Sequence, residues 1–209
     1  MTDIRAICGS VPLIPVLTIE DVDRAVPLAQ ALVIAGLSVL EITLRTETAL
    51  NAIQAVRAAC PDAVVGAGTL RTAEDLTRCV DAGAQFGVSP GAPERLMDAV
   101  DGSGLPFLPG CASATEAMRL ADRGYSFLKF FPAQAAGGTA MLTSLAEPLS
   151  GIEFCPTGGI TIDNARDYLA LPNVVTVGGS WVAPKALTKS EDWKGIENLA
   201  RQAVSHLTQ

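Results

Sequence analysis

The stretch VLEITLRTETALNAIQAVRAAC, residues 39–60, passes from one hydrophobic pattern to another. Residues 39–44 are almost continuously apolar, which is typical of a parallel strand buried on both faces. In residues 46–60 the apolar side chains, among them Leu50 and Ile53, recur at helical spacing. The stretch therefore predicts one strand followed by one helix, the repeating unit of an α/β protein.

The same strand–helix unit repeats along the chain. We expect the other strands at residues 12–17, 64–69, 86–90, 106–110, 127–131, 152–157 and 174–178. Further helices are expected at residues 72–82, 92–100, 113–123, 161–169 and 191–207. About eight such units without a linker predict a single-domain TIM (β/α)8 barrel over residues 1–209, with a short N-terminal segment at 1–11. An open doubly wound sheet is the alternative, but no G-x-G-x-x-G follows the first strand.

Composition excludes several classes of protein. Apolar residues make up 49% of the chain and charged residues 18%, which excludes disorder as the dominant state. The net charge is -7, so we expect no nucleic-acid or membrane partner. The first residues lack the pattern of a signal peptide and no apolar run approaches the length of a membrane span. Five scattered cysteines indicate reduced thiols rather than disulfides or zinc, and hence a cytoplasmic protein.

Lys129 needs an explanation because it interrupts an apolar strand. The other three lysines, Lys185, Lys189 and Lys194, lie in a polar C-terminal stretch. Burial disfavours the charged form of an amine, and a neutral amine can attack a carbonyl to form a Schiff base. The sequence therefore indicates Lys129 as a candidate nucleophile, and a purely structural ion pair is the alternative.

Glu41 is an acidic residue in the middle of a predicted strand. The period of two places Glu41, Thr43 and Arg45 on one face, which can point into a barrel. A carboxylate beside Lys129 can move protons during Schiff-base chemistry, and Arg45 can hold a carboxylate with its guanidinium. A structural Glu41–Lys129 salt bridge predicts the same proximity.

Two glycine pairs follow the last two predicted strands, at residues 157–159 (Thr-Gly-Gly) and 178–180 (Gly-Gly-Ser). In TIM barrels the loops after strands seven and eight frequently bind a phosphate group. Glycine lets the backbone approach a phosphate, whose oxygens accept hydrogen bonds from N–H groups. The pairs together indicate a phosphate site, although tight turns explain each pair alone. Cys111, at the end of the fifth predicted strand, is a further candidate to line the site.

Six segments together resemble a known family. They are VLEITLRTETAL, VVGAGT, GAQFGVSPG, FLKFFPA, FCPTGGI and VGGSWV. The chain resembles the 2-keto-3-deoxy-6-phosphogluconate (KDPG) aldolases, also called 4-hydroxy-2-oxoglutarate (KHG) aldolases. The resemblance implies a class I aldolase with a TIM barrel, without metal or cofactor, usually a homotrimer. Its substrate is a phosphorylated 2-keto acid, cleaved to pyruvate and glyceraldehyde 3-phosphate.

The resemblance also implies roles for individual residues. Lys129 forms the Schiff base and Glu41 is the general acid and base. The pyruvyl carboxylate is held by Arg45 and Thr69 beside the Lys129 adduct. The remaining implied residues bind the substrate and its phosphate (Thr157, Gly158, Gly159, Gly178, Gly179 and Ser180) or shape the pocket (Pro90 and Phe131). Residues 184–195 match no segment of the family.

Three alternative functions stay open on the sequence alone. A related aldolase for 2-keto-3-deoxy-6-phosphogalactonate shares the lysine and differs in the configuration it accepts at C4. A barrel isomerase or decarboxylase for a sugar phosphate uses the glycine loops but no imine. A sugar-phosphate-binding protein keeps Lys129 as a structural ion pair.

Overall fold

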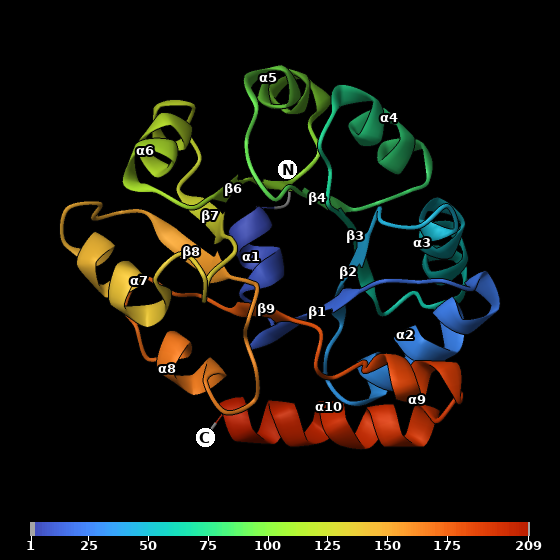
Figure 1. The fold of residues 1–209 in the computed structure, drawn as a ribbon. Helices are drawn as coiled ribbons and strands as arrows, with labels where there is room; N and C mark the ends of the chain where they lie inside the picture. The colour runs from blue at the N-terminus through green and yellow to red at the C-terminus, as the bar shows by residue number, and fades with distance from the viewer. Residues whose placement is uncertain (1–2, 209) are drawn as a thin grey trace.

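The predicted strand–helix units form a ring in the computed structural model, which describes residues 3–208 (Figure 1). The strands are β1 (Leu13–Leu17), β2 (Val39–Thr43), β3 (Val64–Gly68), β4 (Phe86–Val88), β5 (Phe107–Leu108), β6 (Gly110–Cys111), β7 (Phe127–Phe130), β8 (Glu153–Pro156) and β9 (Val177–Gly179). The helices are α1 (Ile4–Cys8), the 3-10 helix η1 (Val22–Arg24), α2 (Ala25–Ile34), α3 (Ala49–Ala59), α4 (Ala73–Asp81), α5 (Glu94–Ser103), α6 (Ala114–Asp122), α7 (Gly138–Ala146), α8 (Ala165–Leu169), α9 (Lys185–Lys189) and α10 (Trp193–Leu207).

The strands curl into a parallel barrel. One run of neighbours is β5-β4-β3-β2-β1-β9 and the other is β6-β7-β8. Pro109 alone separates β5 from β6, and a bridge between Thr157 and Gly178 joins the end of β8 to β9. The two runs therefore close on each other at both ends, and the helices other than α1 lie outside the ring (Figure 1). The predicted fold class, a single-domain TIM barrel, is confirmed.

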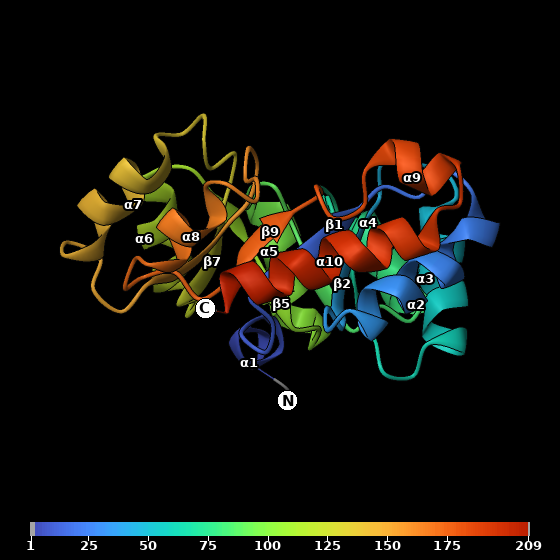
Figure 2. The ribbon, with the colours of Figure 1, turned by 90° about the horizontal axis from the view of Figure 1, so that it is seen from below.

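Helix α1 closes the N-terminal end of the barrel. Cys8 packs inside the barrel with Val39 and Phe86, which begin β2 and β4. Arg5 forms an ion pair with Glu153, the first residue of β8. In Figure 2 this helix lies beneath the strands. The carboxyl ends of the strands are thus left as the accessible end, where barrel enzymes place their chemistry.

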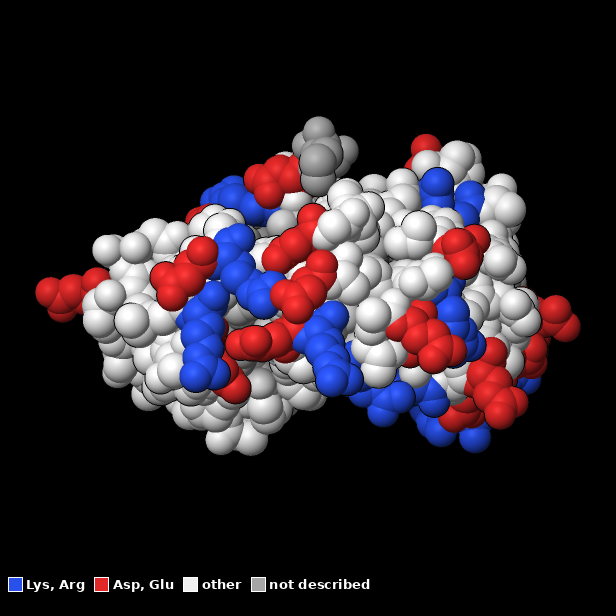
Figure 3. Space-filling model, turned by 90° about the horizontal axis from the view of Figure 1, so that it is seen from above, with Lys and Arg blue, Asp and Glu red and all other residues white. Residues whose placement is uncertain are grey.

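Acidic and basic side chains are interspersed on the face that Figure 3 shows. Ion pairs of this kind also join neighbouring helices. Arg123, the residue after α6, donates to Asp98 and Asp101 of α5 at 2.8 and 2.9 Å. Within residues 3–208, no helix combines the length and the apolar character that crossing a membrane requires.

Several predicted elements differ from the observed ones for local physical reasons. The predicted fifth strand is split into β5 and β6, because Pro109 lacks the N–H that a continuous ladder needs. Helix α8 begins at Ala165 rather than at Thr161, because the Asn164 side chain accepts the N–H of Thr161 and competes with helix formation. The C-terminal helix begins at Trp193, two residues after the predicted start.

Helices α2 and α7 are absent from the prediction. Their sequences, AVPLAQALVI and GTAMLTSLA, contain no charged residue. The sequence therefore lacks the polar stripe that marks an amphipathic helix. Both helices pack on the barrel through leucines, for example Leu28 and Leu142.

Candidate active site

Lys129 and Glu41 meet inside the barrel. Lys129 lies on β7 and Glu41 on β2, strands on opposite sides of the ring, so their contact crosses the interior. The Lys129 amine donates to both carboxylate oxygens, at 3.1 Å to Oε1 and 3.3 Å to Oε2. The two residues are only 4% and 3% exposed. An amine and a carboxylate are therefore held in contact in a nearly dry interior, where a proton can pass between them.

The surroundings leave room for this pair and add no competing charge. A Cβ on Gly68 would overlap the carboxylate of Glu41, so glycine is required there. The ring centroid of Phe131 lies 5.5 Å from the Lys129 amine. Cys155 is the register partner of Lys129 on β8, and burial raises the pKa of its thiol to about 12. The thiol is therefore neutral, and Glu41 supplies the carboxyl group that contacts the amine.

Arg45 and Thr69 lie together at the carboxyl ends of β2 and β3. Arg45 is exposed, and its Nε donates to Thr69 Oγ1 at 3.3 Å. Thr69 has a φ of 65°, a left-handed conformation that is uncommon for a residue with a β-branched side chain. Strained backbone of this kind is concentrated at functional sites. The guanidinium and the hydroxyl can together hold a carboxylate at the barrel mouth.

The loop at residues 157–159 has its carbonyl oxygens bonded to the rest of the protein. The three donors are the Ala133 N–H at 2.8 Å, the Gln134 N–H at 3.0 Å and the Asn164 side-chain amide at 3.0 Å. In a trans peptide the N–H points opposite to the carbonyl, so the N–H groups of residues 158–160 point away from these donors. Gly158 and Gly159 have φ values of 99° and 77°, which glycine adopts without strain. The loop can therefore present N–H groups to an anion.

The second glycine pair has a packing role. A Cβ on Gly178 would overlap the hydroxyl of Thr157, and one on Gly179 would overlap the ring of Trp181. Both glycines are buried within β9, whereas Ser180, directly after the strand, is exposed. Close packing thus accounts for Gly178 and Gly179, and Ser180 is the member of this segment that faces solvent.

Cys111, which the sequence left open as a residue that could line the site, lies away from Lys129. Gly110, not Cys111, is the register partner of Lys129. Cys111 points to the opposite face of the sheet and is buried in the core between strands and helices. The cysteine on the same face as Lys129 is Cys155, which packs in the barrel interior.

Two threonine hydroxyls near the mouth were not predicted as site residues. Thr43 Oγ1 donates to the Leu17 carbonyl at 2.9 Å and lies 3.2 Å from Thr18 Oγ1. The position of Thr43 two residues after Glu41 was the available signal, because the period of two puts both on one face. Pro90, which follows β4, is half-buried and packs closely against Gly110.

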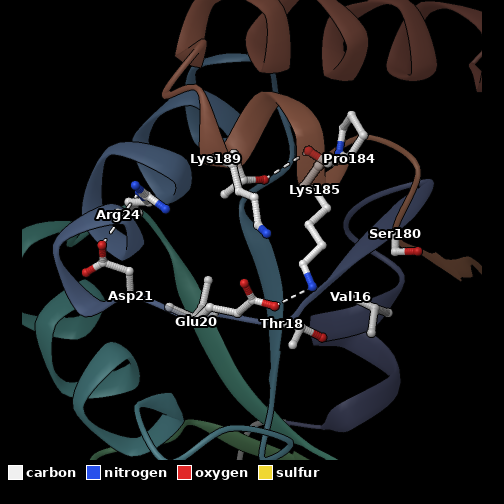
Figure 4. A pocket seen from close by; sticks show the side chains of 12 residues that line it. Val16, Thr18, Glu20, Asp21, Arg24, Ser180, Pro184, Lys185 and Lys189 are labelled. Atoms are coloured by element: carbon white, nitrogen blue, oxygen red, sulfur yellow. Dashed lines mark hydrogen bonds and ion pairs between the residues drawn. The ribbon is translucent and has the colours of Figure 1, made fainter.

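A cavity of about 340 Å³ lies at the carboxyl ends of β1 and β9 (Figure 4). It is lined by Thr18, Ser180 and residues of η1 and α9. Within residues 3–208 no group of three or more histidine, cysteine, aspartate or glutamate side chains is arranged to hold a metal ion.

Comparisons with known proteins point to one family. The family model for KDPG and KHG aldolase matches residues 4–199. The 2-dehydro-3-deoxy-phosphogluconate aldolase of Pseudoalteromonas atlantica is 48% identical over 93% of this chain and 90% of its own. The KHG/KDPG aldolase of Escherichia coli is 44% identical over 97% and 95%.

A solved structure is similar over nearly the whole fold. The KDPG aldolase of Legionella pneumophila, with pyruvate captured as a covalent carbinolamine intermediate, has a TM-score of 0.95 and 42% identity. The match covers 97% of this chain and 98% of that one. With its barrel, its buried lysine–glutamate pair and these relatives, the chain belongs to the KDPG and KHG aldolase family.

Proposed function

We propose that this protein is a class I aldolase that cleaves KDPG to pyruvate and glyceraldehyde 3-phosphate through a Schiff base on Lys129. It also cleaves KHG to pyruvate and glyoxylate. The observation that carries the proposal is the buried contact between the Lys129 amine and the Glu41 carboxylate, at 3.1 Å. The covalent pyruvate adduct of the Legionella relative supports the same chemistry.

The proposed reaction begins with the amine of Lys129. Glu41 accepts a proton from the amine, which then attacks the C2 ketone of the substrate and forms a carbinolamine. Glu41 returns this proton to the carbinolamine hydroxyl, which leaves as water. The iminium that results withdraws electrons from C3. Glu41, acting through water, removes the proton of the C4 hydroxyl, and the C3–C4 bond breaks. The pair of electrons from this bond passes to the iminium and leaves an enamine of pyruvate.

The second half of the reaction restores the enzyme. The enamine is protonated at C3, and the iminium that results is hydrolysed to pyruvate and free Lys129. The iminium is the electron sink throughout, so the proposed steps require no metal and no cofactor. In this mechanism Glu41 moves protons from one position at the Lys129 amine, the carbinolamine oxygen, the C4 oxygen and C3.

The proposed binding roles follow from the ends of the strands. Arg45 and Thr69 hold the pyruvyl carboxylate, which supports attack at the adjacent C2. The N–H groups of residues 158–160 and the hydroxyl of Ser180 hold the phosphate, with Thr157 touching the substrate. Phe131 lies beside the Lys129 amine, and Phe131 and Pro90 limit the shape of the pocket.

We also propose a cytoplasmic homotrimer. Five free and buried cysteines suit a reducing compartment. The trimer rests on the resemblance to the family.

Release of pyruvate from KDPG tests the proposed function. Lactate dehydrogenase and NADH report the pyruvate, and the assay includes EDTA. We expect cleavage that EDTA leaves unchanged; no pyruvate release, or strict dependence on added metal, contradicts the proposal. The C4 epimer, 2-keto-3-deoxy-6-phosphogalactonate, is assayed in parallel. Faster cleavage of the epimer would assign the chain to the galactonate-derived substrate.

A further inference from the structure

Helix α9 lies outside the six segments that carry the resemblance, although the family model spans it. It forms one wall of the cavity of about 340 Å³. Lys185 and Lys189 of α9 line that wall, and residues 18–21 line the facing one. Figure 4 shows the side chains of Lys185 and Lys189 extending into the space between the two walls. The helix therefore brings two amines to the carboxyl end of the barrel.

The cavity borders the proposed reaction centre. Val16, one of its lining residues, pairs in register with Glu41 on the neighbouring strand. Ile14 packs in the barrel interior, and the period of two places Val16 and Thr18 on the same face. Ser180, which also lines the cavity, follows the glycine pair of β9. A substrate held at Lys129 can thus extend into this cavity with its distal end.

Basic side chains gather at the cavity although the chain carries a net charge of -7. Arg24, Lys185 and Lys189 line it together with Glu20 and Asp21. Arg24 is already paired with Asp21 at 3.6 Å and with Glu191 at 3.2 Å, so the two lysines are the cations that an entering anion meets. Lys185 pairs with Glu20, whose pKa is lowered mainly by this hydrogen bond. Within residues 3–208, Lys189 Nζ has no carboxylate within ion-pair distance. Its amine is available to an anion that enters.

We propose that this cavity receives the phosphate of the substrate and that Lys185 and Lys189 determine the preference for a phosphorylated aldehyde. Lys185 exchanges the Glu20 carboxylate for the phosphate when the substrate binds, and Lys189 contacts the same group. In the free protein Glu20 forms an ion pair with Lys185, so its carboxylate competes with the phosphate for this amine. This inference rests on the proposed function and adds its specificity residues.

The aldol addition of pyruvate tests the inference with two acceptors that differ only in the phosphate, glyceraldehyde 3-phosphate and glyceraldehyde. Lys185→Met and Lys189→Met should each lower kcat/KM for the phosphorylated acceptor about tenfold, the scale of one charged hydrogen bond. Their kcat/KM for glyceraldehyde should change less than about twofold. The matched control is Lys194→Met, because Lys194 is exposed on α10 and pairs with Glu197 outside the cavity.

The variant Glu20→Gln should change phosphate binding in the opposite direction to the lysine variants. Removing the competing carboxylate should lower KM for glyceraldehyde 3-phosphate and strengthen inhibition by inorganic phosphate. Equal losses on both acceptors, no loss in the lysine variants, or weaker phosphate binding in Glu20→Gln would each overturn the inference.

Trapping of pyruvate with borohydride in each variant separates the two proposals. A wild-type protein that forms no adduct contradicts the proposed function itself. Adducts in every variant with unchanged acceptor preference contradict only the roles of Lys185 and Lys189. The adduct also confirms that each variant is folded.

Discussion

Lys129 Nζ lies 3.1 Å from Glu41 Oε1, although the two side chains come from strands on opposite sides of the barrel. Removing either partner from a buried ion pair leaves the other charge without compensation. The pair therefore affects stability as well as chemistry, and the two contributions must be measured separately.

Lys129→Ala should abolish cleavage of KDPG while the protein still folds. The variant should also lose about 3 kcal/mol in the free energy of unfolding, because the Glu41 carboxylate stays buried without its partner. The double variant Lys129→Met, Glu41→Gln should recover part of this stability and none of the activity. Denaturant unfolding and pyruvate release are the two measurements. If the double variant recovered cleavage of KDPG together with its free energy of unfolding, the pair would have a structural role only.

Glu41→Gln should lower kcat for cleavage by about 10²- to 10⁴-fold, the usual contribution of a general acid and base. Glutamine keeps the shape of the side chain but cannot accept a proton. The Lys129 amine is still present, so pyruvate should still form an adduct on long incubation with borohydride. Near-normal turnover in this variant would assign the proton transfers to another group.

Gly68→Ala should lower turnover by displacing Glu41, because the added Cβ overlaps its carboxylate. The control is Gly102→Ala on α5, where an added Cβ meets no atom within 4 Å. That control should leave turnover unchanged and increase stability by up to about 1 kcal/mol, the helix propensity difference. If Gly68→Ala keeps wild-type turnover, the position of the carboxylate does not limit the reaction.

The ion pair of α1 should make stability depend on pH. The hydrogen bond from Arg5 holds the pKa of Glu153 below its ordinary value of 4.5. A lowered carboxyl pKa gives stability that is present above pH 4.5 and is lost as the pH falls through the folded-state pKa. Glu153→Gln should therefore have a lower Tm than the wild type at pH 7, and the difference should shrink below pH 4.5. A Tm difference that grows on acidification would contradict the assignment.

The central pair could be predicted from sequence because a charged residue inside an apolar strand is rare and has few explanations. The face of the sheet on which Cys111 lies could not be predicted from sequence. Pro109 breaks the fifth predicted strand in two and interrupts the alternation of side chains along it. The start of α8 depends on Asn164, whose side chain competes with the backbone for hydrogen bonds.

The cavity beside α9 could not be predicted from sequence either, for a different reason. Lys185 and Glu20 are far apart in the chain, and only the closure of β9 against β1 brings them together. A polar stretch with several lysines predicts a solvated surface equally well. The side chains that meet at a barrel mouth are set by the ring of strands, which no local pattern encodes.

Mass analysis after treatment with pyruvate and borohydride tests the proposed Schiff base most directly. We expect one reduced pyruvyl group per chain, on the peptide that contains Lys129, and none in Lys129→Ala. A chain that gains no mass, or that carries the group on Lys185, Lys189 or Lys194 instead, would contradict the assignment of Lys129 as the nucleophile.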